Sequence, residues 1–439
     1  MKSPFQSRSL AIVVIISFYL IAVAIVTAPI ATANAGLFDV VATDLDNPRD
    51  IIFDDAGAMY VAEAGRGGFV AGPTPALNSS GDSAYCFDGP EGFACTGYTG
   101  AITKVEGGVQ ERIVADLPSY ALEADGSGAI GPHGLGFDSE GNLYTLVGLG
   151  APPDFRLEHP SLEYFGYLMQ VVTTTRGNAG GSGWIPVMDV AAYEATANPD
   201  GGVLDSNPFY MTPYGDGFAA TDAGGNALLS LGPAGDRGTG VATLAVFPDV
   251  LAPHPFTPTI MIPMNAVPTG VTTNADSNHL VGQLTGFPFP DGGANVFEIV
   301  AGSPVTMETG FTNILDIDYG ADGSIYVLEM DDNGLLAPDG TGVVTRIHPD
   351  GFREVLASTG LVVPTGMALG PDGAVYVSNF GPAPAGVGQV VRIPVQPTDV
   401  NLSSFGSAGA YGFLALTLLL GIGLALLLLP RWNRSEPQR

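Results

Sequence analysis

Acidic and amide side chains recur at one position of a motif that this sequence repeats. Glu63, Asp222 and Glu329 each end the second of two apolar segments, and Gln283 and Asn379 stand at the matching place in two other copies. Oxygen atoms at equal radius in a ring of repeats would form a polar circle, and clustered oxygens are the ligands that calcium binds. In the alternative interpretation, each side chain accepts hydrogen bonds from its own turn. The second segment lies one step out from the axis, which separates these groups, so we assign no residue to a metal and no cofactor is identified.

Polar residues of a second set stand where the first apolar segment of a copy begins. They are Arg49, His133, Thr269 and Thr365. In a ring these starts converge on the axis, and a concave mouth with a few convergent polar groups is the usual form of a ligand site. Because a histidine side chain ordinarily titrates near neutrality, His133 is the best candidate for proton transfer. The alternatives are a structural hydrogen bond for His133 and an ion pair with Asp50 for Arg49.

Motifs of the common enzyme classes are missing from the sequence. It contains no nucleophile elbow, zinc-protease helix, phosphate-binding loop or dinucleotide fingerprint in a suitable context. The sequence therefore leaves open whether the protein is an enzyme.

Six copies of one sequence motif would position the two sets of polar residues. Each copy has an apolar segment, a tight Asp/Gly turn and a second apolar segment that usually contains Tyr-Val, which is typical of a β-hairpin. A third and a fourth segment follow, as at 342–347 and 353–358. Repeated hairpins at a period of roughly 40–50 residues favour an all-β propeller. The copies that predict six blades are 48–63, 132–147, 208–222, 268–283, 313–329 and 364–379.

The last copy stops after its third segment, at 388–393. Its missing fourth strand has a candidate at the other end of the fold, because residues 40–45 resemble 355–361. We expect the N-terminal segment to complete the last blade and close the ring, which protects the sheet edges.

Both ends of the chain carry export and membrane signals. Residues 1–35 resemble a signal peptide, with Lys2 and Arg8 before an apolar stretch and with cleavage expected after Ala35. After the propeller at 36–395 and a linker at 396–409, residues 410–429 are long enough to cross a bilayer. Arg431 and Arg434 place the tail, 430–439, in the cytoplasm and the propeller outside. In the alternative, the C-terminal segment is a sorting signal that is removed, which leaves the protein secreted or at the surface.

Composition restricts the partners further. The 439 residues include 44 Asp and Glu against 15 Lys and Arg, so the protein lacks the basic stripes that nucleic acid requires. The 46% hydrophobic content indicates a packed core. Cys86 and Cys95 are the only cysteines, and their spacing in an exported protein predicts a local disulfide.

Several longer motifs resemble the ScyD/ScyE family of exported β-propellers with NHL-like repeats. The resemblance covers about residues 38–395, although Gln283 stands where an acid is usual and the membrane tail lies outside it. It implies an NHL/TolB-like six-bladed fold and an association with the gene cluster for the pigment scytonemin, and it supplies no catalytic residues. The matching motifs are 45–49, 60–68, 86–102, 131–133, 193–202, 221–226 and 284–289.

Three functions are compatible with these observations. The first is an exported, membrane-tethered propeller that binds a small molecule or a protein partner without catalysis, through irregular loops at 65–97 and 251–265. The second is an extracytoplasmic enzyme or accessory factor for a small aromatic or lactone-like metabolite. The third is a cell-surface assembly protein. A short helix is expected at 190–197, where Tyr193 either covers the mouth of the ring or packs against its side.

Overall fold

A computed structural model describes residues 38–69, 85–89, 92–173, 182–232 and 240–395. The chain divides into two compact units, 1–394 and 395–439, and the described residues lie almost wholly in the first. Within these residues, no helix has both the length and the apolar character needed to cross a bilayer. The expected signal peptide, linker, membrane span and tail lie outside the described residues.

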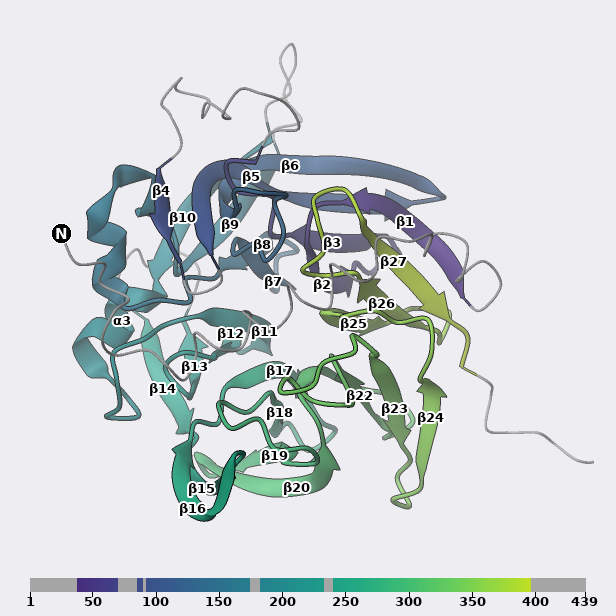
Figure 1. Cartoon of the computed structure of the whole chain (residues 1–439). Helices are drawn as coiled ribbons and strands as arrows, with labels where there is room; N and C mark the ends of the chain where they lie inside the picture. The colour runs from purple at the N-terminus through teal and green to yellow at the C-terminus, as the bar shows by residue number, and fades with distance from the viewer. Residues whose placement is uncertain (1–37, 70–84, 90–91, 174–181, 233–239, 396–439) are drawn as a thin grey trace, which may run out of the picture. The chain divides into compact units, whose positions relative to one another are not determined.

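Six antiparallel sheets surround a common axis, as Figure 1 shows. Blade one consists of β2 (Pro48–Phe53), β3 (Met59–Glu63), β5 (Phe93–Glu106) and β6 (Val109–Leu122). Blade two consists of β7 (Pro132–Phe137), β8 (Leu143–Val147), β9 (Tyr167–Thr173) and β10 (Ser182–Asp189). Blade three consists of β11 (Pro208–Tyr214), β12 (Gly217–Asp222), β13 (Ala227–Leu231) and β14 (Val241–Val246).

The second half of the ring repeats this arrangement. Blade four consists of β17 (Pro268–Thr273), β18 (His279–Gln283), β19 (Ala294–Val300) and β20 (Ser303–Phe311). Blade five consists of β21 (Ile314–Tyr319), β22 (Ile325–Glu329), β23 (Val343–Ile347) and β24 (Arg353–Ala357). Blade six consists of β25 (Gly366–Leu369), β26 (Val375–Asn379), β27 (Gly388–Ile393) and β1 (Asp39–Leu45). The predicted six-bladed propeller is confirmed.

Elements outside this pattern are few among the described residues. Strand β4 (Cys86–Asp88) pairs with the start of β5, and two 3-10 helices, η3 (Pro153–Glu158) and η4 (Pro160–Leu162), precede β9. Helix α3 (Val190–Ala197) lies where the sequence predicted it. The segment 251–265 was expected to be an irregular loop, and this was wrong. Strands β15 (Val250–His254) and β16 (Thr257–Met264) pair antiparallel there and form a separate hairpin.

Turn chemistry explains why the first two strands of a blade form hairpins. In blade one, Asp54 Oδ1 accepts hydrogen bonds from the N–H groups of Ala56 and Ala58. Gly57 has φ +85°, a conformation that favours glycine. Asp138 and Asp322 make related bonds in blades two and five. The turns therefore lie together on one face of the ring, opposite the face where the innermost strands begin.

The innermost strands approach one another closely around the axis. A Cβ on Gly366 would lie 2.2 Å from the carbonyl oxygen of Arg49 on the neighbouring strand β2, and one on Gly270 would lie 2.6 Å from Cα of Asp316 on β21. Glycine at these positions is thus required by the narrow centre of the ring.

Strand β1 closes the ring, as predicted. It runs antiparallel to β27, with Asp39 opposite Arg392 and Leu45 opposite Gly388. Leu45 is fully buried in a cluster with Ile51, Val61 and Val390, which joins blade six to blade one. Closure therefore combines a hydrogen-bonded ladder with apolar packing.

We predict that Leu45→Ala destabilises the whole domain. Truncation of a fully buried leucine costs about 2–5 kcal/mol, since it leaves a cavity as well as lost apolar contact. Val40→Ala in the same strand is the matched control, because Val40 is 45% exposed. Thermal melts should show a large loss of Tm for Leu45→Ala and a small one for Val40→Ala. Equal small losses would mean that β1 does not hold the ring closed.

Candidate functional site

The starts of the six innermost strands form the floor of one cavity. Arg49, His133, Thr269 and Thr365 all line it, as the sequence predicted for a shared mouth. The cavity has a volume of about 140 Å³. Two further members of the same circle were missed in the sequence: Phe209 in blade three and Leu315 in blade five. A signal for Phe209 was present, because Pro208 aligns with the Pro that precedes Arg49 or His133.

The disulfide hairpin forms part of the cavity wall. Cys86 and Cys95 are bonded, which confirms the prediction, and they face each other across β4 and β5. This crosslink holds Phe87, whose ring lines the cavity and contacts those of Tyr120 and Phe155 edge-on at 5.4 and 5.0 Å between centroids. Most remaining wall residues are apolar, so the cavity offers a hydrophobic enclosure over a floor with a few polar groups.

His133 lines the cavity and has one hydrogen-bond acceptor that is not used. Its Nδ1 lies 3.3 Å from the carbonyl oxygen of Pro208, and its ring packs on Phe209 with 5.2 Å between centroids. A carbonyl oxygen can only accept, so Nδ1 carries the proton and Nε2 bears a lone pair. Nε2 is buried and has no partner among the described residues. Burial, followed by the positive charge of Arg49, lowers the pKa of His133 to about 3, so the imidazole is neutral at pH 7.

Backbone carbonyls fix the other polar members of the circle. The Arg49 guanidinium donates to the carbonyl oxygens of Gly381 at 2.9 Å and Ala129 at 2.7 Å. Thr269 Oγ1 donates to Ile314 at 2.8 Å, and Thr365 Oγ1 to Pro48 at 2.6 Å. These bonds run from one blade to another, so the floor of the cavity is rigidly positioned.

Tyr210 crosses the axis directly beyond this floor. Its hydroxyl donates to the carbonyl oxygen of Thr365 on the opposite side of the ring, and its side chain is 2% exposed. A second cavity of about 860 Å³ lies on the hairpin-turn face, with Tyr210, Asp50 and Asp316 in its lining. Asp50 accepts from Leu135 N at 2.7 Å and Asp316 from Met367 N at 2.8 Å. Burial raises the pKa of both carboxyls, and the charge of Asp50 raises that of Asp316 further.

The residues that end the second strands are placed differently from the circle of the cavity floor. None of Glu63, Asp222, Gln283, Glu329 or Asn379 lines the 140 Å³ cavity. They bond nearby chain segments: Glu63 accepts from Asp46 N at 2.7 Å and Glu329 from Thr312 N at 2.6 Å. Asp222 accepts from the N–H groups of Asn207, Gly224 and Gly225, Gln283 from Asn295 Nδ2, and Asn379 from Val362 N. Glu63 also accepts from Thr103 and Arg112 of its own blade. Each side chain thus anchors a loop of its own blade.

Glu329 gives a testable pH dependence. Burial and then the charge of Asp332 raise its pKa to about 7, although the Thr312 N–H and Arg353 oppose this. Because the folded pKa lies above the unfolded one, the group's contribution to stability is complete below pH ~4.5 and is lost as pH rises through about 7.

We therefore predict that Glu329→Gln flattens this dependence, because an amide oxygen can still accept from Thr312 N, as Gln283 accepts in blade four. Relative to wild type, the variant should gain stability between pH 5 and pH 8, by at most roughly 3 kcal/mol for 2.5 pKa units. Melts at both pH values measure this, with the exposed Glu140→Gln as control. An equal change in the stability of Glu329→Gln relative to wild type at both pH values would contradict the prediction.

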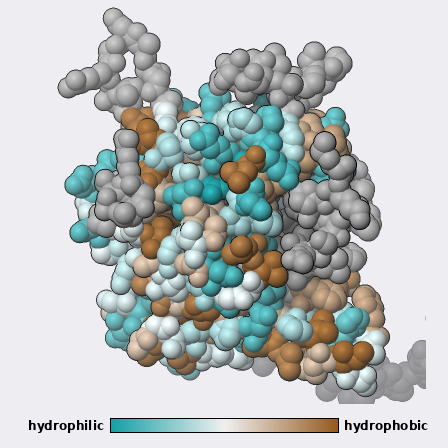
Figure 2. Space-filling view, turned by 90° about the vertical axis from the view of Figure 1, so that its left-hand side faces the viewer, coloured by the Kyte–Doolittle hydropathy of each residue, from teal (hydrophilic) through white to brown (hydrophobic). Residues whose placement is uncertain are grey.

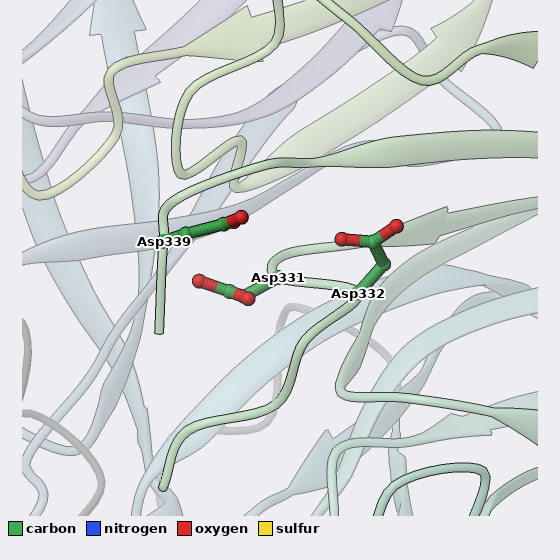
Figure 3. A group of neighbouring side chains, drawn as sticks. All are labelled: Asp331, Asp332 and Asp339. Carbon is green, nitrogen blue, oxygen red and sulfur yellow. The ribbon is translucent and has the colours of Figure 1, made fainter. Parts of the chain in front are cut away.

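Three aspartates gather in the loop after β22, as Figure 3 shows. Oxygens of Asp331, Asp332 and Asp339 lie within 4.8 Å of one another. Burial, then the charges of the other two, raise the pKa of Asp331 to about 6. Backbone N–H groups of Asn333 and Gly340 donate to Asp331, and Asn333 Nδ2 donates to Asp339. Hydrogen bonds within the loop account for the cluster, and we assign no ligand to it.

Helix α3 lies beside the ring and not over the cavity. Tyr193 shares a hydrogen bond of 2.9 Å with Thr243 on β14 and packs against the apolar cluster between blades two and three. Tyr193 is absent from the lining of the cavity. Of the two alternatives for this residue, packing against the side of the ring is therefore the one observed.

No protein-family model and no curated protein sequence matches the chain. Solved structures with a similar fold include a streptogramin B lyase, with 13% identity, 81% of this chain and 98% of that chain covered, and a TM-score of 0.38. The PQQ-bound aldose sugar dehydrogenase from Streptomyces coelicolor is 11% identical, with 82% of this chain and 97% of that chain covered and a TM-score of 0.46. Regucalcin, a calcium-binding protein from Agrobacterium tumefaciens, is 11% identical, with 82% of this chain and 96% of that chain covered and a TM-score of 0.39. These proteins are enzymes or binding proteins, and at such identities the likeness assigns no activity to this chain.

Proposed function

We propose that the protein is an exported, membrane-tethered propeller that binds a small, mainly apolar molecule at the mouth floored by His133 and Arg49. The observation that carries this proposal is the unpartnered Nε2 of His133 beside an apolar cavity. A buried acceptor without a partner costs about 1–3 kcal/mol, which a ligand donor would recover. A dry apolar cavity of about 150 Å³ can hold one aromatic ring, and this cavity has about 140 Å³.

The chemistry of the floor favours binding over catalysis. A general base works best with a pKa near the operating pH, and that of His133 is lowered to about 3. A ligand that combines an aromatic ring with a hydroxyl group would fill the apolar space and donate to Nε2. The aromatic metabolites implied by the resemblance to the ScyD/ScyE family belong to this class, and their binding is compatible with an accessory role in secondary metabolism.

We predict that the cavity prefers phenol to toluene, because only phenol can donate to His133. A net hydrogen bond of about 1 kcal/mol corresponds to roughly a 5-fold difference in Kd. His133→Ala should abolish the preference with little change in Tm. Isothermal titration with both probes measures this, and His254→Ala, outside the cavity on β15, is the matched control.

Either of two outcomes would reject this assignment. One is equal affinity of wild type for phenol and toluene. The other is a large loss of Tm in His133→Ala with an unchanged preference, which would make His133 a structural residue.

The proposed tether predicts a defined response to proteolysis. Residues 410–429 are apolar and are followed by Arg431 and Arg434, so protease added to intact cells should digest the propeller and leave a short membrane-bound fragment. A chain that ends before residue 410 should instead appear in the medium. Immunoblots of both fractions provide the measurement, with one tag placed after the expected cleavage site at Ala35 and another at the C-terminus. Complete protection of the full-length chain would exclude an outward-facing propeller.

A further inference from the structure

A second group of buried oxygens lies outside the cavity, between helix α3 and the start of β11. Glu194 Oε1, Asn198 Oδ1 and Asp205 Oδ1 are each buried and have no hydrogen-bond partner among the described residues. The side chains of Glu194 and Asp205 are only 2% and 3% exposed. With both carboxyls ionised, all three atoms are acceptors and cannot satisfy one another.

The chain brings these three residues together through Glu194. The N–H of Asn198 donates to the carbonyl oxygen of Glu194 at 3.0 Å, and residues four apart lie on one side of a helix. Asn198 has φ +38° and is the C-terminal cap of α3. The backbone N–H of Asp205 donates to the Glu194 carboxylate. Asn198 and Asp205 are therefore both neighbours of Glu194, to which their backbone N–H groups donate.

Two more carboxylates surround this loop. Asp200 is held by Asn226 Nδ2 at 2.9 Å, and Asp222 accepts from Asn207, Gly224 and Gly225 N. A Cβ on Gly225 would lie 2.8 Å from Glu194 Oε2 and 3.4 Å from Cγ of Asp222, so the two carboxylates are neighbours.

The electrostatic consequence is that these carboxyls favour neutralisation, either by protons or by a bound cation. Burial and then the charges of Asp222, Asp200 and Asp205 raise the pKa of Glu194 to about 8. Burial and the charges of Asp222 and Asp200 raise that of Asp205 to about 7. Buried charges are normally paired or bind a metal.

We propose that Glu194, Asn198 and Asp205 form a calcium site, with Asp200 and Asp222 supplying further negative charge. Calcium accepts six to eight oxygen ligands from carboxylates, amides, carbonyls and water. Residues 201–204, between Asn198 and Asp205 in the sequence, are exposed. The side of the domain that carries α3 faces the viewer in Figure 2, where hydrophilic and apolar residues are interspersed.

The site would order one edge of the proposed ligand cavity. Two residues beyond Asp205, Asn207 lines that cavity and its Oδ1 accepts from Leu149 N at 3.1 Å. Phe209, which packs on His133, follows on β11. Calcium would thus fix the loop from which two cavity residues extend.

The test uses the full-length protein purified in detergent, stripped with EDTA and then titrated with Ca²⁺. We expect one ion per chain at this site and a rise in Tm of roughly 5 °C at 100 times Kd. Glu194→Gln and Asp205→Asn keep the size of each side chain and should each weaken binding at least 10-fold. In EDTA these variants should melt at or above the wild-type Tm, since they remove repulsion. Asp339→Asn, in the other acidic cluster, is the matched control and should bind normally.

Three results would overturn the proposal. Metal analysis could find no calcium on folded wild-type protein in millimolar Ca²⁺, a result that does not depend on any variant. Both variants could retain wild-type affinity. Binding could be lost in Asp339→Asn alone, which would move the site to the loop after β22.

Discussion

Each innermost strand has one edge without a strand partner, and the rest of the structure depends on how that edge is satisfied. Six such edges meet around the axis, where buried N–H and C=O groups cannot be left unpaired. Side chains from neighbouring blades supply the missing bonds. Asp50 accepts from Leu135 N and Asp316 from Met367 N, while Thr269 and Thr365 donate to Ile314 and Pro48 carbonyls. The blades are therefore joined at the axis by polar contacts, in addition to the apolar packing between their faces.

The need to pair these edges also distinguishes polar side chains that have a structural hydrogen bond from those that are free to bind a ligand. Thr269 and Thr365 line the cavity, but their hydroxyls already bond the next blade. The hydroxyl of Tyr210 is used in the same way, since it donates to the carbonyl oxygen of Thr365. His133 differs, since one ring nitrogen bonds Pro208 and the other has no partner among the described residues. The candidate site is thus the place near the axis where a polar side chain keeps an unused hydrogen-bond acceptor.

The structural features that depend on local sequence pattern could be predicted from the sequence. The Asp/Gly turns and alternating strands predicted the hairpins, the resemblance of 40–45 to 355–361 predicted closure, and the spacing of Cys86 and Cys95 predicted their disulfide. It did not predict contacts that depend on radial position. Tyr210 reaches Thr365 across the ring, and no periodicity in the chain encodes that distance. The free oxygens of Glu194 and Asp205 were likewise missed, because burial decides their importance and the sequence does not show burial.

Closure by β1 has a consequence for the order of folding. Asp39 and Arg392 pair across the closing strands although they lie 353 residues apart in the sequence. During synthesis β1 leaves the ribosome first, and its partner β27 is made only after every other strand. Contacts between such distant segments form slowly, and unpaired strands in the interim are prone to aggregate. The nascent propeller therefore carries an unfinished edge for most of translation, and the ring can close only after the last strand has been made.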